Sequence, residues 1–93
     1  MSGFGSQTGS YKQLSASANC LPSSGKMLGI FVSAASATPT ITVYDSATTG
    51  TATKIVDTFT PTASTWYPIP VNATAGFYVV ISGTVSCTVV TLP

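Results

Sequence analysis

The feature that most constrains the fold is a series of short runs rich in Val, Ile, Thr and aromatic residues, separated by clusters of Gly, Pro, Ser and Asn. Such runs are typical of β-strands, because branched and aromatic side chains pack well on a pleated surface. No window of about ten residues has an apolar helical stripe free of Thr, Gly or Pro. We therefore expect an all-β domain with about seven strands, near Tyr11–Leu21, Lys26–Ala34, Thr40–Tyr44, Thr53–Phe59, Thr65–Val71, Gly76–Ser82 and Val85–Leu92.

The spacing of these strands, about 8–12 residues, favours two packed sheets or a small barrel. We expect a single antiparallel β-sandwich of the jelly-roll or immunoglobulin-like kind over residues 11–93. Residues 1–10 are rich in Gly and Ser, and this composition predicts a flexible N-terminal arm. The arm either stays disordered or becomes ordered when Phe4, its only large apolar residue, binds a neighbouring subunit.

Alternation along the strands indicates which side chains face the core. The side chains expected to point inward come from three strands: Ile41 and Val43; Ile55, Asp57 and Phe59; and Val85, Cys87 and Val89. Two strands are apolar on both faces, which predicts that they are central or covered by another subunit. They are Phe77–Ile81 and the strand from Lys26, where Leu28, Ile30 and Val32 lie on one face and Met27, Gly29 and Phe31 on the other.

Pro68 and Pro70 occupy alternate positions in one predicted strand. Each proline removes a backbone donor, so this strand can pair fully on one side only. We expect an edge strand here, and blocked edges protect a Val- and Thr-rich protein from stacking into fibrils.

Charged side chains are scarce: three Lys, two Asp and no His, Glu or Arg in 93 residues. Ser and Thr, roughly a third of the chain, supply the polar surface instead. A net charge of +1 provides no basic stripe for a phosphate backbone, so we expect no nucleic-acid partner. A domain this small is marginally stable alone, so we also expect a disulfide or a subunit interface.

The sequence predicts no enzyme, no metal site and no cofactor. Without His, none of the many serines has the usual base to activate it, and a zinc site has no imidazole ligand. Asp45 and Asp57 are the only carboxylates. We expect Asp45 to cap its own turn, Asp45 to Gly50. Asp57-Thr58 matches the first two residues of the Asp-Thr-Gly motif of aspartic proteases, but Phe59 stands where that motif requires glycine, so we discard the match.

Cys20 and Cys87 are far apart in sequence and could either form a disulfide or remain two buried thiols.

The longest largely apolar stretch, Met27 to Ala37, is too short to cross a bilayer, so we expect no membrane partner. The first residues lack the features of a secretory signal, so we expect synthesis in the cytoplasm unless the chain is a processed fragment. Without a secretory route, the Asn72-Ala73-Thr74 pattern is not expected to be glycosylated, and we expect Asn72 to serve the turn before Gly76.

Aromatic residues are the best candidates for an interface, because they bury large areas at little entropic cost. The candidates are Phe4, Tyr11, Trp66, Tyr67 and Tyr78. The neighbours Trp66 and Tyr67 could instead be core and half-exposed residues, or form a stacking platform for a sugar ring.

From Gly25 onward the chain resembles small β-sandwich structural proteins of tailed-bacteriophage virions. The stretches that carry the resemblance are Gly25 to Ile30, Ile41 to Ser46 with Gly50-Thr51, Lys54-Ile55, Trp66 to Pro70, and Ala75 to Thr84. The resemblance implies a capsid decoration, or cement, protein on the capsid exterior, with the major capsid protein as its partner and no catalytic residues.

We therefore expect a cement protein that stabilises the shell by bridging capsid subunits, itself a homo-oligomer, most simply a homotrimer at local three-fold axes. The first alternative is a carbohydrate-binding or adhesin module of a head or tail fibre. The second is a bacterial surface or pilus-like subunit.

Overall fold

The computed structural model describes residues 10–92, which form six antiparallel strands and no helix. It therefore has no helix long and apolar enough to cross a membrane within this range. The strands are β1 (Ser10–Leu14), β2 (Ala18–Leu21), β3 (Gly25–Asp45), β4 (Lys54–Phe59), β5 (Thr65–Ala73) and β6 (Phe77–Leu92). The all-β antiparallel class is confirmed, whereas the expected arm lies outside the described residues apart from Ser10.

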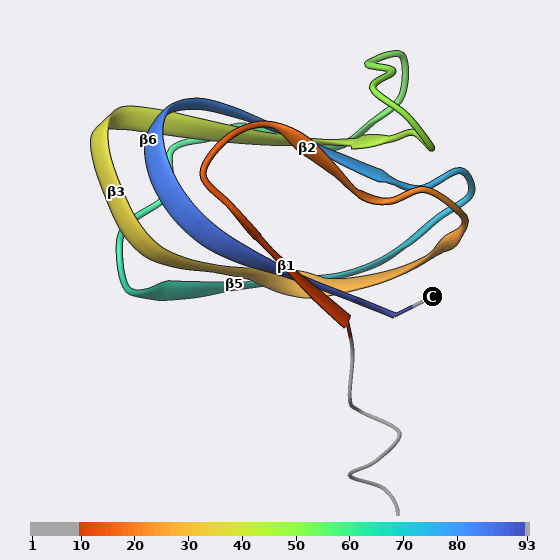
Figure 1. Cartoon of the computed structure of the whole chain (residues 1–93), viewed down its shortest axis with the longest axis horizontal. Helices are drawn as coiled ribbons and strands as arrows, with labels where there is room; N and C mark the ends of the chain where they lie inside the picture. The colour runs from red at the N-terminus through yellow and green to blue at the C-terminus, as the bar shows by residue number, and fades with distance from the viewer. Residues whose placement is uncertain (1–9, 93) are drawn as a thin grey trace, which may run out of the picture.

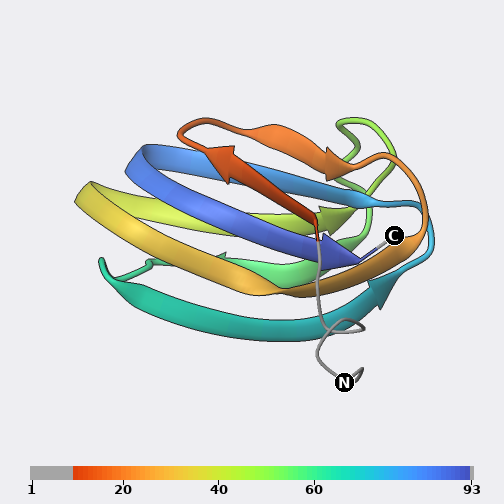
Figure 2. The ribbon, with the colours of Figure 1, turned by 60° about the horizontal axis from the view of Figure 1, so that its bottom comes forward.

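Two long strands dominate the structure, because β3 and β6 pair with each other along almost their whole length. Both strands bend sharply near the middle, so that one continuous sheet curls over on itself (Figures 1 and 2). Each long strand replaces two of the expected short ones, and the expected strand Tyr11–Leu21 is divided into β1 and β2. The result is a curled single sheet rather than two separate sheets.

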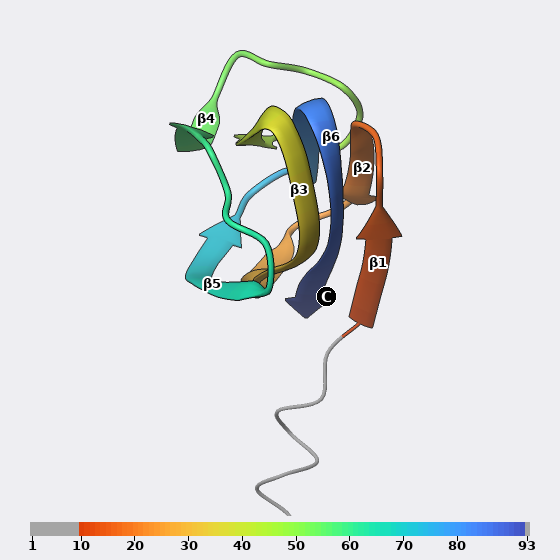
Figure 3. The ribbon, with the colours of Figure 1, turned by 90° about the vertical axis from the view of Figure 1, so that its left-hand side faces the viewer.

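The curl produces two layers, which Figure 3 shows from the side of the bend. In the lower layer the order is β5, the first half of β3, the second half of β6, and β1. In the upper layer the order is β4, the second half of β3, the first half of β6, and β2. The four short strands therefore lie at the edges, and the predicted edge position of Pro68 and Pro70 in β5 is confirmed.

The bend forms where β3 contains extra residues. Ser36 pairs with Thr84 and Thr40 with Ser82, so that residues 37–39 of β3 lie opposite Gly83 alone. Thr38 and Gly83 have positive φ angles of 49° and 84°. Such conformations turn the chain sharply, and glycine adopts them without steric cost. The cluster 37–39 and Gly83 were expected to be breaks between strands, and they are instead the two sides of the bend.

The core lies between the layers, and it contains Ile41, Val43, Val85, Cys87 and Val89, as alternation predicts. In β4 the prediction is wrong for Asp57, which is exposed, because register shifts in the pairing of β3 with β4 interrupt the alternation; Ile55 and Phe59 are half-buried against the core. A second bulge changes the prediction for the start of β3. Met27 pairs with Thr91 and Gly29 with Val90, which leaves Leu28 as an extra residue. Because a bulge reverses the alternation, the fully buried Met27 shares the inner face with Ile30 and Val32, and Leu28 is half-buried. The prediction had placed Leu28, not Met27, on the face of Ile30 and Val32. The buried apolar residues are Leu14, Leu21, Met27, Ile30, Val32, Ile41, Val43, Ala73, Phe77, Val79, Val85, Cys87 and Val89.

Candidate interaction surface

On the outer side of the lower layer, three large apolar side chains are exposed, and we call the surface that they form the aromatic face. Its three large exposed side chains are Tyr11, Phe31 and Trp66, which are 77%, 41% and 45% exposed. They come from β1, β3 and β5, so the face extends across the whole layer. Large apolar side chains that are exposed together on one face are typical of an interaction site.

Trp66 is held against the sheet by a glycine on the neighbouring strand. A Cβ atom added to Gly29 would lie 2.7 Å from two atoms of the Trp66 ring, and closer still to the carbonyl oxygen of Tyr67. Only a residue without a side chain allows the indole to lie across β3 in this way. Phe31 is the direct cross-strand partner of Trp66, so the two rings lie on neighbouring strands of one face.

The alternation along β5 is regular. Trp66, Pro68 and Pro70 are exposed, whereas Tyr67 and Ile69 are half-buried against the core. The prolines thus extend the apolar surface beside Trp66. Their missing N–H groups also weaken this strand as a site for further strand pairing.

Tyr67 lies on the opposite side of β5 from Trp66. Its hydroxyl oxygen accepts a hydrogen bond from the backbone N–H of Thr62 at 2.7 Å, and its ring packs on Phe59 with centroids 5.2 Å apart. The two neighbours in sequence therefore do not form one stacking platform. Phe31, which is not among the predicted interface residues, lies beside Trp66 instead. Its place on the second apolar face of its strand, two residues after Gly29, is the sequence feature that could have identified it.

The other predicted interface residues are dispersed. Tyr78 lies in the upper layer, half-buried, with its ring 6.2 Å from that of Tyr44. Tyr11 belongs to the aromatic face. Phe4 lies outside the described residues. The structure thus brings together Tyr11 and Trp66 on one face and separates them from Tyr67 and Tyr78.

Asp45 caps a distant turn and not its own. Its carboxylate accepts hydrogen bonds from the backbone N–H groups of Thr74, Ala75 and Gly76, and from the Thr74 hydroxyl, at 2.8–3.2 Å. Donation by the Ala75 and Thr74 N–H groups, above all, lowers the pKa of Asp45 to about 2. The expected local cap is instead provided by Ser46, whose hydroxyl oxygen accepts from the N–H groups of Thr48 and Gly50. No hydrogen bond of the Asn72 side chain is found within residues 10–92, so its expected role in this turn is not seen.

The second carboxylate forms the one ion pair found within residues 10–92. Asp57 accepts a hydrogen bond from Lys54 at 3.1 Å, and this contact lowers the pKa of Asp57 and raises that of Lys54. The two carboxylates thus have separate partners. Both Asp45 and Asp57 are used in contacts within the chain.

The cysteines are free thiols, with Cys87 buried and Cys20 half-buried. Burial raises the pKa of Cys20 to about 11 and also raises that of Cys87. A raised pKa keeps a thiol protonated and a poor nucleophile. Across residues 10–92, no three His, Cys, Asp or Glu side chains come together in a group that could hold a metal ion.

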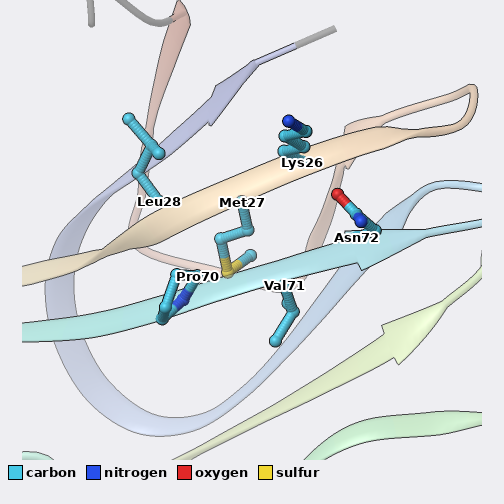
Figure 4. Close-up of a pocket in the computed structure, with 6 residues that line it drawn as sticks. All are labelled: Lys26, Met27, Leu28, Pro70, Val71 and Asn72. Carbon is cyan, nitrogen blue, oxygen red and sulfur yellow. The ribbon is translucent and has the colours of Figure 1, made fainter.

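A pocket of about 280 Å³ opens between β3 and β5 beside the aromatic face. It forms where the pairing of these strands is irregular, between the pairs Met27–Val71 and Gly29–Pro68. Six residues line it: Lys26, Met27, Leu28, Pro70, Val71 and Asn72. Figure 4 shows Lys26, Leu28 and Asn72 on one side of the two strands, and Met27 and Val71 on the other.

No family model, no curated protein and no solved structure matches this chain.

Proposed function

We propose that this protein is a structural subunit that binds other protein subunits through its aromatic face, most specifically a bacteriophage capsid cement protein. The observation that carries the proposal is the position of Trp66, Phe31 and Tyr11, three large apolar side chains that are exposed on the same side of one four-stranded layer. Aromatic side chains on a rigid sheet lose little entropy when they are covered, so such a face is suited to permanent contacts.

The edges of the sheet support association by a face rather than by strand addition. Prolines interrupt β5, and register shifts interrupt the pairing of β4 and β2. In the last edge strand, β1, Lys12 pairs with Val89, which is a core residue. Paired residues lie on the same face of a sheet, so Lys12 places a charge at the edge of the inner face. Bulges, prolines and inward-facing charges all discourage edge-to-edge pairing. Association through a face of the sheet is therefore favoured over association through an edge.

The specific role as cement is supported by the resemblance over Gly25 to Thr84 and by the small number of charges. A subunit that binds only the assembled shell stabilises it by mass action. The major capsid protein is the proposed partner, and a homotrimer remains the proposed state of the subunit. A carbohydrate-binding role is less well supported, because Trp66 and Tyr67 do not share a face.

The test is binding of the purified protein to virus particles from the source of this sequence. The protein should sediment with the particles, and electron microscopy should show it outside the shell. Phe31→Ser with Trp66→Ser should raise the apparent Kd for particles at least tenfold, which corresponds to about 1.4 kcal/mol, a modest value for a pair of interface aromatics.

The matched control is Val80→Ser, a change on the outer face of the upper layer, which should leave binding unchanged. A wild-type protein that stays in the supernatant, or a control that loses binding as fully as the double variant, would contradict the proposal. Binding of glycans by the isolated protein, lost in Trp66→Ala, would favour the carbohydrate alternative.

A further inference from the structure

The pocket between β3 and β5 has a polar rim whose side chains have no partner within residues 10–92. Lys26 and Asn72 are directly opposite each other in the pairing of the two strands, and both are exposed. Directly opposite side chains on one face lie about 5 Å apart at Cβ. Across residues 10–92, neither side chain forms a hydrogen bond or an ion pair. An ammonium group and an amide at this separation are suited to binding a carboxylate together.

The rest of the pocket is apolar. Leu28 and Pro70 stand beside the rim, and Val71 and the fully buried Met27 close the pocket toward the core (Figure 4). The volume of about 280 Å³ exceeds the approximately 150 Å³ cavity that holds a benzene ring, and it is below the usual range for a drug-sized ligand. One aliphatic or aromatic side chain is therefore the size of group that fits.

A second copy of this chain is poorly suited to supply the carboxylate. Its two candidates are Asp45, which is held by four hydrogen bonds from Thr74, Ala75 and Gly76, and Asp57, which pairs with Lys54. Charge complementarity therefore points to a different protein.

We propose that this pocket binds an apolar side chain that stands next to an Asp or Glu on a partner protein of different sequence. The apolar side chain fills the space beside Leu28 and Pro70, and the carboxylate accepts hydrogen bonds from Lys26 and Asn72. Because the pocket adjoins the aromatic face, this contact rests on the proposed function and identifies the chemistry of the partner surface.

A direct test uses the isolated full chain and short peptides. The probe is the acetylated, amidated peptide Gly-Leu-Asp-Gly, titrated to millimolar concentration while the Leu28 methyl and Asn72 side-chain amide signals are followed by NMR. The controls are Gly-Leu-Asn-Gly, which lacks the carboxylate, and Gly-Ser-Asp-Gly, which lacks the apolar group. Both controls should bind about fivefold more weakly, the effect of losing one partly exposed contact.

The matched variants are Lys26→Gln and Lys54→Gln, which remove the same charge from the rim and from a distant surface. Lys26→Gln should lower affinity for the Asp peptide to that for the Asn peptide, and Lys54→Gln should not. The inference is overturned if the three peptides shift the signals equally or not at all. It is also overturned if the signals move on dilution without peptide, because a second copy would then be the occupant.

Particle binding separates this inference from the proposed function. If wild-type protein binds particles and Lys26→Gln binds as well as Lys54→Gln, the pocket is not part of the contact, although the proposed function stands. If the peptides give the expected pattern but wild-type protein does not bind particles, the proposed binding of a carboxylate and an apolar side chain by the pocket is supported, and the proposed capsid role is contradicted.

Discussion

The two layers of the curled sheet share one core but differ on their outer sides. In the upper layer, polar groups bind one another: Thr42 and Thr58 share a hydrogen bond of 2.7 Å, and Lys54 pairs with Asp57 at 3.1 Å. The aromatic face of the lower layer instead presents exposed rings, among them Trp66. Groups that are satisfied within the chain need no partner, whereas a continuous apolar surface gains free energy when it is covered.

The difference indicates which parts of the molecule stabilise the fold and which part we expect to bind a partner. The end of the upper layer is fixed by long-range contacts: Asp45 holds the turn before β6, and the amide of Asn19 donates to the carbonyl oxygens of Ser46 and Thr48. Among residues 10–92, no comparable long-range polar contact involves Phe31 or Trp66. Substitutions at the fixed end should therefore change folding, and substitutions on the aromatic face should change association.

The largest effect is expected for Gly76→Ala, at the turn held by Asp45. Gly76 has a φ of 156°, and an added Cβ would lie 2.7 Å from the carbonyl oxygen of Ser46 and closer to that of Leu21. Since both obstacles are backbone atoms, the turn must move, at a cost of about 3 kcal/mol or more. Urea unfolding measures the loss.

Gly50→Ala is the matched control for this change. A Cβ at Gly50 would approach only the Ser46 side chain, at 3.1 Å, in an exposed loop. The loss should be well under half of that at Gly76. Equal losses at the two positions would show that the turn before β6 is not specially constrained.

The next effect depends on pH and concerns Asp45. Its pKa is about 2 in the folded chain and near 4 when unfolded, so the ionised carboxylate stabilises the fold above pH 4. That stabilisation is lost as the pH falls from about 4 toward 2. Asp45→Asn should lower the free energy of unfolding at pH 7 and flatten its decline below pH 4.

Asp57→Asn provides the comparison for the acid range. Its pKa is lowered by an exposed contact with Lys54, which water screens. Most of the acid sensitivity should therefore remain in this variant. If Asp57→Asn removes as much of the pH dependence as Asp45→Asn, the turn before β6 is not the main acid-sensitive element.

Much of the fold could be predicted from local patterns. The inward positions of Ile41 and Val43, and the edge position of Pro68 and Pro70, follow from alternation and from missing N–H groups, and both are confirmed. The bulge at Leu28 could not be predicted, because it depends on how β3 pairs with β5 and β6, which are far away in sequence. The same holds for Gly83, which has the appearance of a strand break and is part of a continuous bent strand.

The candidate surface could be predicted in part. Trp66 and Tyr11 are both among the predicted interface residues, and the structure exposes them on one face. Phe31 was placed on the second apolar face of its strand, but its pairing with Trp66 depends on register, which local pattern does not determine. Asp45 was expected to serve the nearest turn, because sequence alone gives no sign that a turn 29 residues away lies within reach.

A smaller effect should come from the hydrogen bond between Thr42 and Thr58. Thr42 is 5% exposed and Thr58 is exposed, so the two hydroxyls differ in access to water. Thr58→Val leaves a buried hydroxyl without its partner and should cost about 1–2 kcal/mol, whereas Thr42→Val should cost less than about 1 kcal/mol. The double variant should be closer to wild type than Thr58→Val alone, which a double-mutant cycle of unfolding measures. Equal single losses would indicate that Thr42 finds another partner.

The smallest effect on stability, and the sharpest contrast between the faces, is expected for Phe31→Thr. Phe31 is 41% exposed and Thr is favoured in strands, so the free energy of unfolding should change by only about 0.5 kcal/mol. Removing the ring interrupts the aromatic face beside Trp66, so retention on a hydrophobic-interaction column should fall clearly. The matched control is Val80→Thr, which removes a half-buried apolar group from the outer side of the upper layer. Retention of this variant on the column should barely change. If both variants elute equally early, apolar surface is shared by the two faces, and binding cannot be assigned to the lower layer alone.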